Sequence, residues 1–256
     1  MQLLKHLIKK HFWKIVFKNK IFSNAATQNK EFVSLLDESP DFSKNKFNIF
    51  TVDDEDGILL NIIAKIKPDK KTFVDIGSND CINSNCANLA FHHNWSGVFI
   101  DGNKSVLERG KYIYTKYFGE SVNRFSFLPA IVTVKNINQI LTDKLPQNDI
   151  DLLSIDLDGN DYFIWNTITV VNPKIVVTEV QVEKGNADFI PEQTAEFELY
   201  ESDVPKGASP LSMLKLANSK GYELVAANKG CYNLFFVRKD CMGKLKHMGI
   251  EEALCE

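Results

Sequence analysis

Three acidic side chains crowd one turn of this chain. Asp156, Asp158 and Asp161 follow the apolar run Leu152–Ile155, and Glu179 closes the next such run. Like charges this close disfavour joint ionisation unless a cation or a hydrogen-bond donor compensates them. Oxygen ligands of this kind suit a hard ion such as Mg²⁺, with Asp156 and Glu179 as the candidate metal ligands. The alternative is that the acids accept backbone hydrogen bonds, cap the helix that follows and hold the ammonium group of a cofactor.

A second group of residues that could bind a ligand lies earlier in the chain. The run Thr72–Ile76 contains Asp75 and leads into Gly77, and the run Gly97–Ile100 stops at Asp101. Buried parallel strands that deliver functional groups at their carboxyl ends have this pattern. Gly77 permits a tight turn close to a ligand, and Asp101 is where Rossmann-like sheets place the acid that binds a ribose diol. The pair predicts a nucleoside-binding site. Its candidate cofactor-binding residues are Asp75, Gly77, Ser78, Asn79, Asp101, Gly102 and Asp156.

The turn after the first run favours S-adenosylmethionine over a dinucleotide. A dinucleotide enzyme needs G-x-G-x-x-G, because the pyrophosphate must lie on a helix N-terminus. The turn Gly77–Cys81 has one glycine and several polar side chains instead. Such a turn suits the amino-acid zwitterion of S-adenosylmethionine. The alternative is a strand-to-helix turn without a ligand, capped by Asp80 or Ser84.

Methyl transfer to an alcohol is an in-line displacement in which a base is needed mainly to remove the hydroxyl proton. The candidate catalytic residues are Asp158, Asp161 and Glu179. The acidic cluster is expected to tune the pKa of whichever carboxylate acts as the base. A histidine base is disfavoured, because none of the five histidines falls at the end of an expected strand. The adjacent His92 and His93 are expected to end a helix in solvent.

The elements that must position these residues can be expected from periodicity. The expected strands are Thr72–Ile76, Gly97–Ile100, Phe125–Val132, Asp149–Asp156, Lys174–Val180, Tyr222–Ala227 and Tyr232–Arg238. The expected helices are Asp54–Ile66, Asn85–Phe91, Lys104–Tyr114, Tyr162–Ile168 and Ser209–Lys220, and residues 23–50 are expected to be a connector. This order predicts an α/β fold with a Rossmann-like sheet of seven strands whose last strand is antiparallel.

The composition indicates which kinds of binding partner and which cellular compartment to expect. The chain has 256 residues, a formal net charge of −3 and five cysteines. Without a basic excess to neutralise phosphates, a nucleic-acid partner is disfavoured. The cysteines form no CxxC pair, which indicates reduced thiols in a cytoplasm.

Two further segments are expected to contact a membrane, the domain surface or the acceptor. Met1–Phe22 interleaves lysines with apolar residues and carries no acid. It is neither a membrane span nor a signal peptide. It fits an amphipathic helix on the inner face of an anionic membrane, or a helix packed on the domain with a solvated lysine face. The acidic segment Glu183–Pro205 is expected to close over the acceptor.

Several motifs together resemble a known family. They are Val74–Asp80, Ile150–Asp161, Ile175–Glu179, Gly207–Ser209, Lys220–Val225 and Asn233–Arg238, in that order. They resemble FkbM-like S-adenosylmethionine-dependent methyltransferases of surface-polysaccharide and natural-product pathways, over about residues 70 to 240. Cys81 departs from the glycine common in such turns, and Gln181 follows Glu179 where an asparagine is expected.

The resemblance implies a class I methyltransferase domain at 71–240, between a helical N-terminal extension at 1–70 and a C-terminal tail at 241–256. It implies O-methyl transfer to a sugar-like or polysaccharide-precursor acceptor. By match, Asp75, Gly77, Ser78 and Asn79 contact the methionine and ribose part. Asp101 then binds the ribose hydroxyls, while Asp156 and Asp158 stand beside the sulfonium and the acceptor.

The first seventy residues have no counterpart in the family. A lid, a contact with a second copy of the chain and a membrane dock stay open as their roles. Two rival classes remain for the whole protein: an NAD-dependent oxidoreductase, whose glycine turn is absent, and a non-catalytic binding protein on the same fold.

Overall fold

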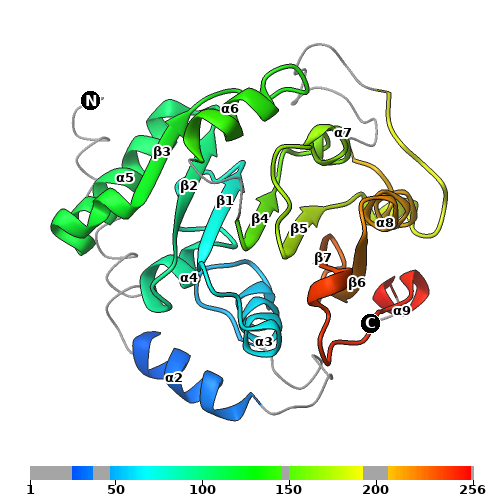
Figure 1. The fold of residues 1–256 in the computed structure, drawn as a ribbon, viewed down its shortest axis with the longest axis horizontal. Helices are drawn as coiled ribbons and strands as arrows, with labels where there is room; N and C mark the ends of the chain where they lie inside the picture. The colour runs from blue at the N-terminus through cyan, green and yellow to red at the C-terminus, as the bar shows by residue number, and fades with distance from the viewer. Residues whose placement is uncertain (1–24, 37–46, 146–149, 193–206, 255–256) are drawn as a thin grey trace, which may run out of the picture.

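The computed structural model describes residues 25–36, 47–145, 150–192 and 207–254 (Figure 1). The expected basic helix Met1–Phe22 lies outside these residues and stays a prediction, as does most of the segment expected to close over the acceptor. None of the helices in the described ranges is both long and apolar enough to cross a membrane.

A seven-stranded sheet forms the centre of the molecule. Its strands lie in the order β3-β2-β1-β4-β5-β7-β6. The first five are mutually parallel, and β7 is antiparallel to both β5 and β6. The expected sheet is therefore confirmed. The strands are β1 (Thr72–Ile76), β2 (Ser96–Asp101), β3 (Phe125–Pro129), β4 (Leu152–Ile155), β5 (Ile175–Glu179), β6 (Tyr222–Ala227) and β7 (Asn233–Arg238).

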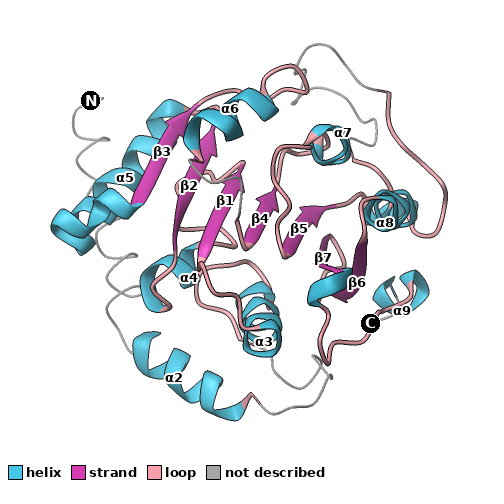
Figure 2. Ribbon diagram, in the orientation of Figure 1, coloured by secondary structure: helices cyan, strands magenta, loops and turns pink. Residues whose placement is uncertain are grey.

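Helices cover both faces of the sheet, which gives three layers (Figure 2). Because successive strand residues point to opposite faces, β1 contributes Phe73 to one apolar cluster and Val74 to the other. One face carries α2 (Ala25–Leu35), α3 (Glu55–Ile66), α4 (Ala87–His92) and α5 (Lys104–Phe118), and the other carries α6 (Ile137–Lys144), α7 (Asp161–Thr167), α8 (Pro210–Ser219) and α9 (Ile250–Leu254).

The polar stretch expected to be a connector contains helix α2, so that expectation was wrong. Its buried residues are Ala25, Asn29 and Phe32. Phe32 stacks on Phe47 at 4.6 Å between ring centroids, and Asn29 exchanges two amide hydrogen bonds of 3.0 Å with Asn88 of α4. This buried face is narrow and includes an asparagine, so the sequence of α2 shows little apolar periodicity. The helix is stabilised mainly by its contacts with the rest of the protein, which the local sequence does not reveal. Helices α6 and α9 were missed for a similar reason, since each buries two apolar residues.

The expectation that His92 and His93 end a helix in solvent was half right. They do end α4, but both rings are partly buried, and Nε2 of His93 lies 2.6 Å from Oδ1 of Asn29. Burial lowers the pKa of each ring to about 4. Helix α2, unforeseen in the sequence, covers this end of α4.

A buried ion pair fixes the amino end of β5. Nζ of Lys174 lies 2.9 Å from Oδ1 of Asp151, whose side chain is fully buried, and the contact is ionic rather than a well-aligned hydrogen bond. The backbone N–H of Lys71 also donates to this carboxylate. We expect Lys174→Met to lower the free energy of unfolding by about 2 to 3 kcal/mol, because it leaves a buried charge with fewer partners. Urea denaturation measures the loss.

The control is Lys215→Met, which breaks the ion pair with Asp188. Both side chains there are more than half exposed, so the expected cost is below about 1 kcal/mol. Equal losses in the two variants would contradict a special role for the Asp151 pair.

Candidate functional site

The turn after β1 is held against the turn after β4. Gly77 has φ +80°, and its N–H donates to the carbonyl of Ile100 at 2.9 Å. A Cβ built on Gly77 would lie 1.6 Å from the carbonyl oxygen of Asp156. Only glycine allows this approach. Cys81, four residues on, is buried with φ +59°, a left-handed conformation that favours glycine.

Asp101 ends β2 with its carboxylate fixed by two loops. Oδ2 accepts a hydrogen bond from the backbone N–H of Asn79 at 2.7 Å, and Oδ1 accepts one from the N–H of Asn103 at 2.6 Å. Asn79 has φ +47°, a conformation that asparagine tolerates better than most residues. Each carboxylate oxygen keeps a free lone pair. The sequence-predicted pair Asn79 and Asp101 is therefore brought together, with capacity left to accept two hydroxyl groups.

Three other predicted residues play different parts in this turn. Asp75 is buried and accepts from the hydroxyl of Ser84, and burial raises its pKa to about 7. Ser78 is also buried, and its hydroxyl donates to the carbonyl of Ile100 at 3.3 Å. Gly102 is exposed beside Ile131. Asp75 and Ser78 thus shape the turn from inside, whereas Gly102 lies on the surface next to Asp101.

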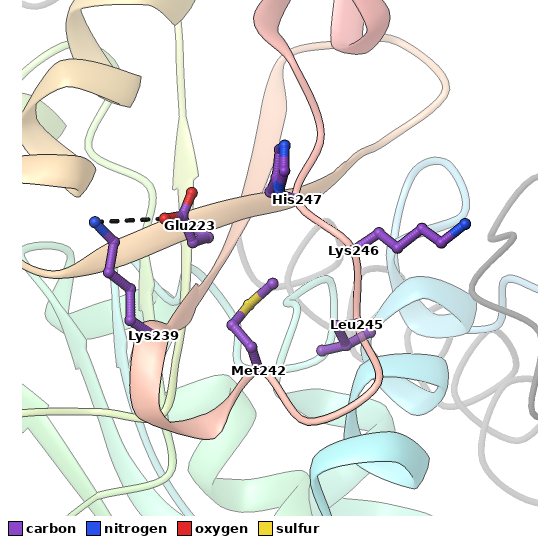
Figure 3. A pocket seen from close by; sticks show the side chains of 6 residues that line it. All are labelled: Glu223, Lys239, Met242, Leu245, Lys246 and His247. Carbon is purple, nitrogen blue, oxygen red and sulfur yellow. Dashed lines mark ion pairs between the residues drawn. The ribbon is translucent and has the colours of Figure 1, made fainter.

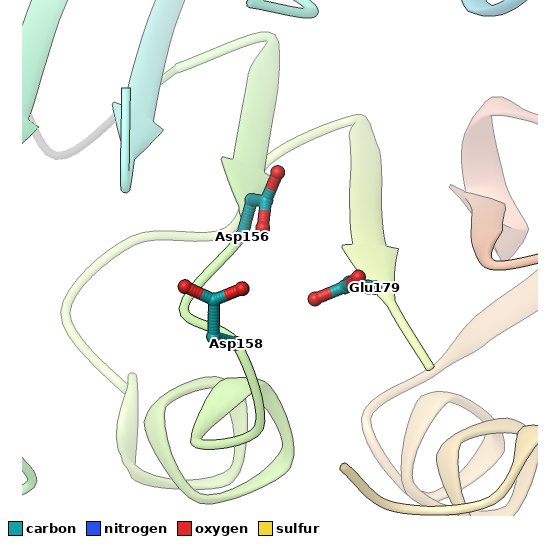
Figure 4. Close-up of side chains that lie close together, drawn as sticks. All are labelled: Asp156, Asp158 and Glu179. Atoms are coloured by element: carbon teal, nitrogen blue, oxygen red, sulfur yellow. The ribbon is translucent and has the colours of Figure 1, made fainter. Parts of the chain in front are cut away.

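An acidic triad lies at the carboxyl ends of β4 and β5. Asp156, Asp158 and Glu179 each offer a carboxylate oxygen, and these oxygens lie within 4.8 Å of one another (Figure 4). The N–H of Asp156 bonds to the carbonyl of Ile76, which ties the triad to the end of β1. Asp158 reaches its position through a left-handed backbone, φ +48°. The predicted approach of Asp156 and Glu179 is present in the structure, and Asp158 joins them.

Two carboxyls of the triad, Asp156 and Glu179, have a raised pKa. Burial, followed by repulsion from Asp156 and its neighbours, raises the pKa of Glu179 to about 8. Burial and Asp158 raise the pKa of Asp156 to about 6, although its side chain is still reached by solvent. The triad therefore carries less than its full negative charge at neutral pH, and a cation placed there would favour the ionised forms.

Asp161 closes the turn that presents the triad. Its carboxylate is buried and accepts backbone hydrogen bonds of 3.0 Å from Leu157 and from Gly159. Burial raises its pKa to about 7. This geometry favours a positioning role for Asp161 and leaves Asp158, which is exposed, as the accessible candidate base.

A polar cluster next to the triad was not foreseen in the sequence. Oε1 of Glu55, in the first turn of α3, accepts hydrogen bonds from Asn228 at 2.9 Å, from the hydroxyl of Tyr232 at 3.2 Å and from Asn233 at 3.3 Å. The signal that could have found it is a glutamate at a helix start, facing an asparagine-rich hairpin. We call these four residues the α3–hairpin wall.

A pocket of about 660 Å³ lies elsewhere, between β6 and the chain after β7 (Figure 3). Its lining residues are Glu223, Lys239, Met242, Leu245, Lys246 and His247. Glu223 is near the start of β6, which runs in the same direction as β5. The pocket thus belongs to the opposite edge of the sheet from the triad and adds nothing to that site.

No protein-family model matches the chain, and no curated protein matches it. Among solved structures it is similar to a candidate caffeoyl-CoA O-methyltransferase from Staphylococcus aureus, with a TM-score of 0.50 and 13% identity over 90% of this chain and 99% of that one. It is also similar to an O-methyltransferase from Bacillus cereus in complex with SAH, with a TM-score of 0.48 and 11% identity over 87% and 96% of the two chains. Together with the strand order, the first of these likenesses shows the class I, Rossmann-like methyltransferase fold.

Proposed function

We propose that this protein is an S-adenosylmethionine-dependent O-methyltransferase of the FkbM-like type. The observation that carries the proposal is the contact between the Gly77 turn and Asp156. Because of this contact, the turn that we propose binds the nucleoside lies beside the acidic triad, at the edge of the sheet where α/β folds bind ligands. The proposed acceptor is a hydroxyl of a sugar-like or polysaccharide-precursor molecule.

The residues divide between the two substrates. Asp101, oriented by the backbone of Asn79 and Asn103, accepts the ribose hydroxyls. The Gly77 turn holds the methionine part, with Asp75 and Ser78 supporting it from inside. Asp156 lies where the positive sulfonium and ammonium groups meet carboxylate oxygens.

The reaction follows from this placement. The acceptor oxygen attacks the methyl carbon in line with the sulfonium sulfur, and the carbon–sulfur bond breaks with its electron pair going to sulfur. S-adenosylhomocysteine leaves, and the hydroxyl proton passes to the carboxylate of Asp158. Positioning supplies most of the rate, and the base contributes a smaller factor.

The triad also fits a Mg²⁺ ion. All three donors are carboxylate oxygens, which is the chemistry that Mg²⁺ prefers, and an ion there would offset the mutual repulsion that, after burial, raises the pKa values of Asp156 and Glu179. Asp156, Asp158 and Glu179 would hold it. When bound, the ion would polarise the acceptor hydroxyl and ease loss of its proton.

Thermal melting with S-adenosylhomocysteine and with NAD tests the cofactor. At one hundred times its dissociation constant a ligand stabilises the native state by about 2.7 kcal/mol. We expect this shift with S-adenosylhomocysteine and none with NAD. A shift with NAD alone would favour an oxidoreductase, and no shift with either would favour a non-catalytic binding protein.

Asp101→Asn tests the site itself. The new amide NH₂ would face a backbone N–H that the carboxylate now accepts, and the ribose would lose a charged acceptor. We expect at least about tenfold weaker binding of S-adenosylhomocysteine. Asp143→Asn, on an exposed face of α6, is the matched control and should bind as the wild type does.

A further inference from the structure

The α3–hairpin wall stands directly beside the acidic triad, on the side away from β1 and β2. Asn233 is the register partner of Glu179 in the antiparallel β5–β7 pair. Directly opposite residues of such a pair have their side chains on the same face, about 5 Å apart at Cβ. The carbonyl of Tyr232 accepts from the N–H of Val180 at 2.8 Å, immediately after β5. Glu179, Asn233 and Glu55 therefore follow one another along the carboxyl edge of the sheet.

Glu55 fixes the orientation of the amide of Asn233. A carboxylate can only accept hydrogen bonds, so the NH₂ group of Asn233 must face Glu55, and Oδ1 must face away from it. Asn233 is 6% exposed, and its Oδ1 has no hydrogen-bond partner among the described residues. A buried acceptor left unpaired costs about 1 to 3 kcal/mol. This oxygen lacks a donor that a ligand could supply.

The wall and the triad offer acceptors and negative charge. Glu55, Asp156, Asp158 and Glu179 are carboxyl groups. The ring of Tyr232 is partly exposed and packs on Gly230, where a Cβ would meet it at 2.3 Å. An anionic group brought here would meet like charges, which costs several kcal/mol in a specific interface.

We propose that the α3–hairpin wall binds the acceptor, and that the acceptor meets it with a hydrogen-bond donor that carries no negative charge. The substrate class is a sugar-like molecule with free hydroxyl or protonated amine groups at this end and without phosphate there. Glu55 acts as a positioning residue that orients Asn233 and Tyr232. The inference rests on the proposed methyl transfer, because it names the acceptor of that reaction.

Ligand-detected NMR on the protein saturated with S-adenosylhomocysteine tests the wall with three probes: methyl glucoside, glucosamine and glucose 6-phosphate. EDTA is present so that no metal bridges a phosphate to the triad. We expect the first two to bind and the phosphate to bind at least about tenfold more weakly. Equal binding of the phosphate, or no binding of either uncharged or protonated sugar, would overturn the inference.

Two variants assign the selectivity to the wall. Asn233→Leu keeps the approximate shape of the side chain and removes both its oxygen and the NH₂ group that donates to Glu55. We expect at least about fivefold weaker sugar binding. Tyr232→Phe removes one hydrogen-bond donor to Glu55 with little risk to folding, and it should also weaken sugar binding. Asn218→Leu, exposed at the end of α8, is the control. Unchanged sugar binding in both wall variants would also overturn the inference.

The cofactor measurement keeps the two proposals apart. If S-adenosylhomocysteine fails to bind, methyl transfer is excluded whatever the sugars do. If it binds to the wild type and to both wall variants alike, and sugar binding does not depend on Asn233 or Tyr232, the proposed function survives and the acceptor wall does not.

Discussion

Gly77→Ala is expected to lower the free energy of unfolding by roughly 4 kcal/mol or more, or to prevent folding. The added Cβ would lie 1.6 Å from the carbonyl oxygen of Asp156 and 2.7 Å from its carbonyl carbon. The Cβ would strike a backbone carbonyl, and the two turns directly follow β1 and β4, which are hydrogen-bonded neighbours, so neither turn can move away at low cost. The positive φ adds strain of its own. For a chain of this size each kcal/mol corresponds to about 2 to 4 °C in Tm.

Gly102→Ala is the matched control for this effect. It also follows a strand of the proposed cofactor site, but its Cβ would meet only the side chain of Ile131, at 3.3 Å, in an exposed position. We expect a change within about 1 kcal/mol. Thermal and urea denaturation of both variants decide the matter, and a Gly77→Ala protein as stable as Gly102→Ala would contradict the close contact between the two turns.

Glu179→Gln is expected to make the protein more stable than the wild type at pH 9, in the absence of metal. The pKa of Glu179 is raised from 4.5 to about 8 in the native state. Between these values the native state holds a proton that the unfolded state releases, so the stability from this group is present at pH 4.5 and is lost as the pH rises through 8. The expected loss is on the order of 3 kcal/mol after allowing for partial exposure. Glutamine carries no such charge and escapes the loss.

The measurement is the free energy of unfolding between pH 5 and pH 9, with and without Mg²⁺. Wild type should fall more steeply with pH than Glu179→Gln, and Mg²⁺ should restore wild type at pH 8 with release of protons, but not the variant. Glu108→Gln, on the exposed face of α5, should follow the wild type. Parallel pH profiles for wild type and Glu179→Gln would show that Glu179 titrates normally, and a Mg²⁺ effect that survives the substitution would place the ion elsewhere.

The elements of the sheet were predictable from sequence because each strand is a short apolar run with a clear end. Thr72–Ile76 was expected with the bounds that β1 has, and the helix after Ser209 was expected from a capping serine followed by proline, which α8 confirms. Helix α2 was not predictable in this way. Its buried face contains Asn29, whose partner Asn88 is 59 residues away, and no local pattern marks such a pair.

The candidate site was predictable to the extent that it lies at strand ends. Asp101, Asp156 and Glu179 follow strands directly, and the order of parallel strands brings them to one edge. Glu55 and Asn233 were not predicted as site residues, because Glu55 reaches Asn233 and two other residues of the hairpin only through long-range hydrogen bonds. Asp161 was predicted as a site residue. Its hydrogen bonds from the backbone of Leu157 and Gly159 were not predictable, because they depend on the path of the turn.

The position of β7 between β5 and β6 affects how the protein can fold during its synthesis on the ribosome. The Gly77 turn and Asp101 emerge early, and β1 and β2 can pair as soon as both are synthesised. Glu179 meets its neighbour Asn233 only after a further 54 residues have been made. Until then the edge of β5 is unpaired and open to other strands. The nascent chain thus forms the part that we propose binds the nucleoside before the part that we propose binds the acceptor, and β7 completes the sheet.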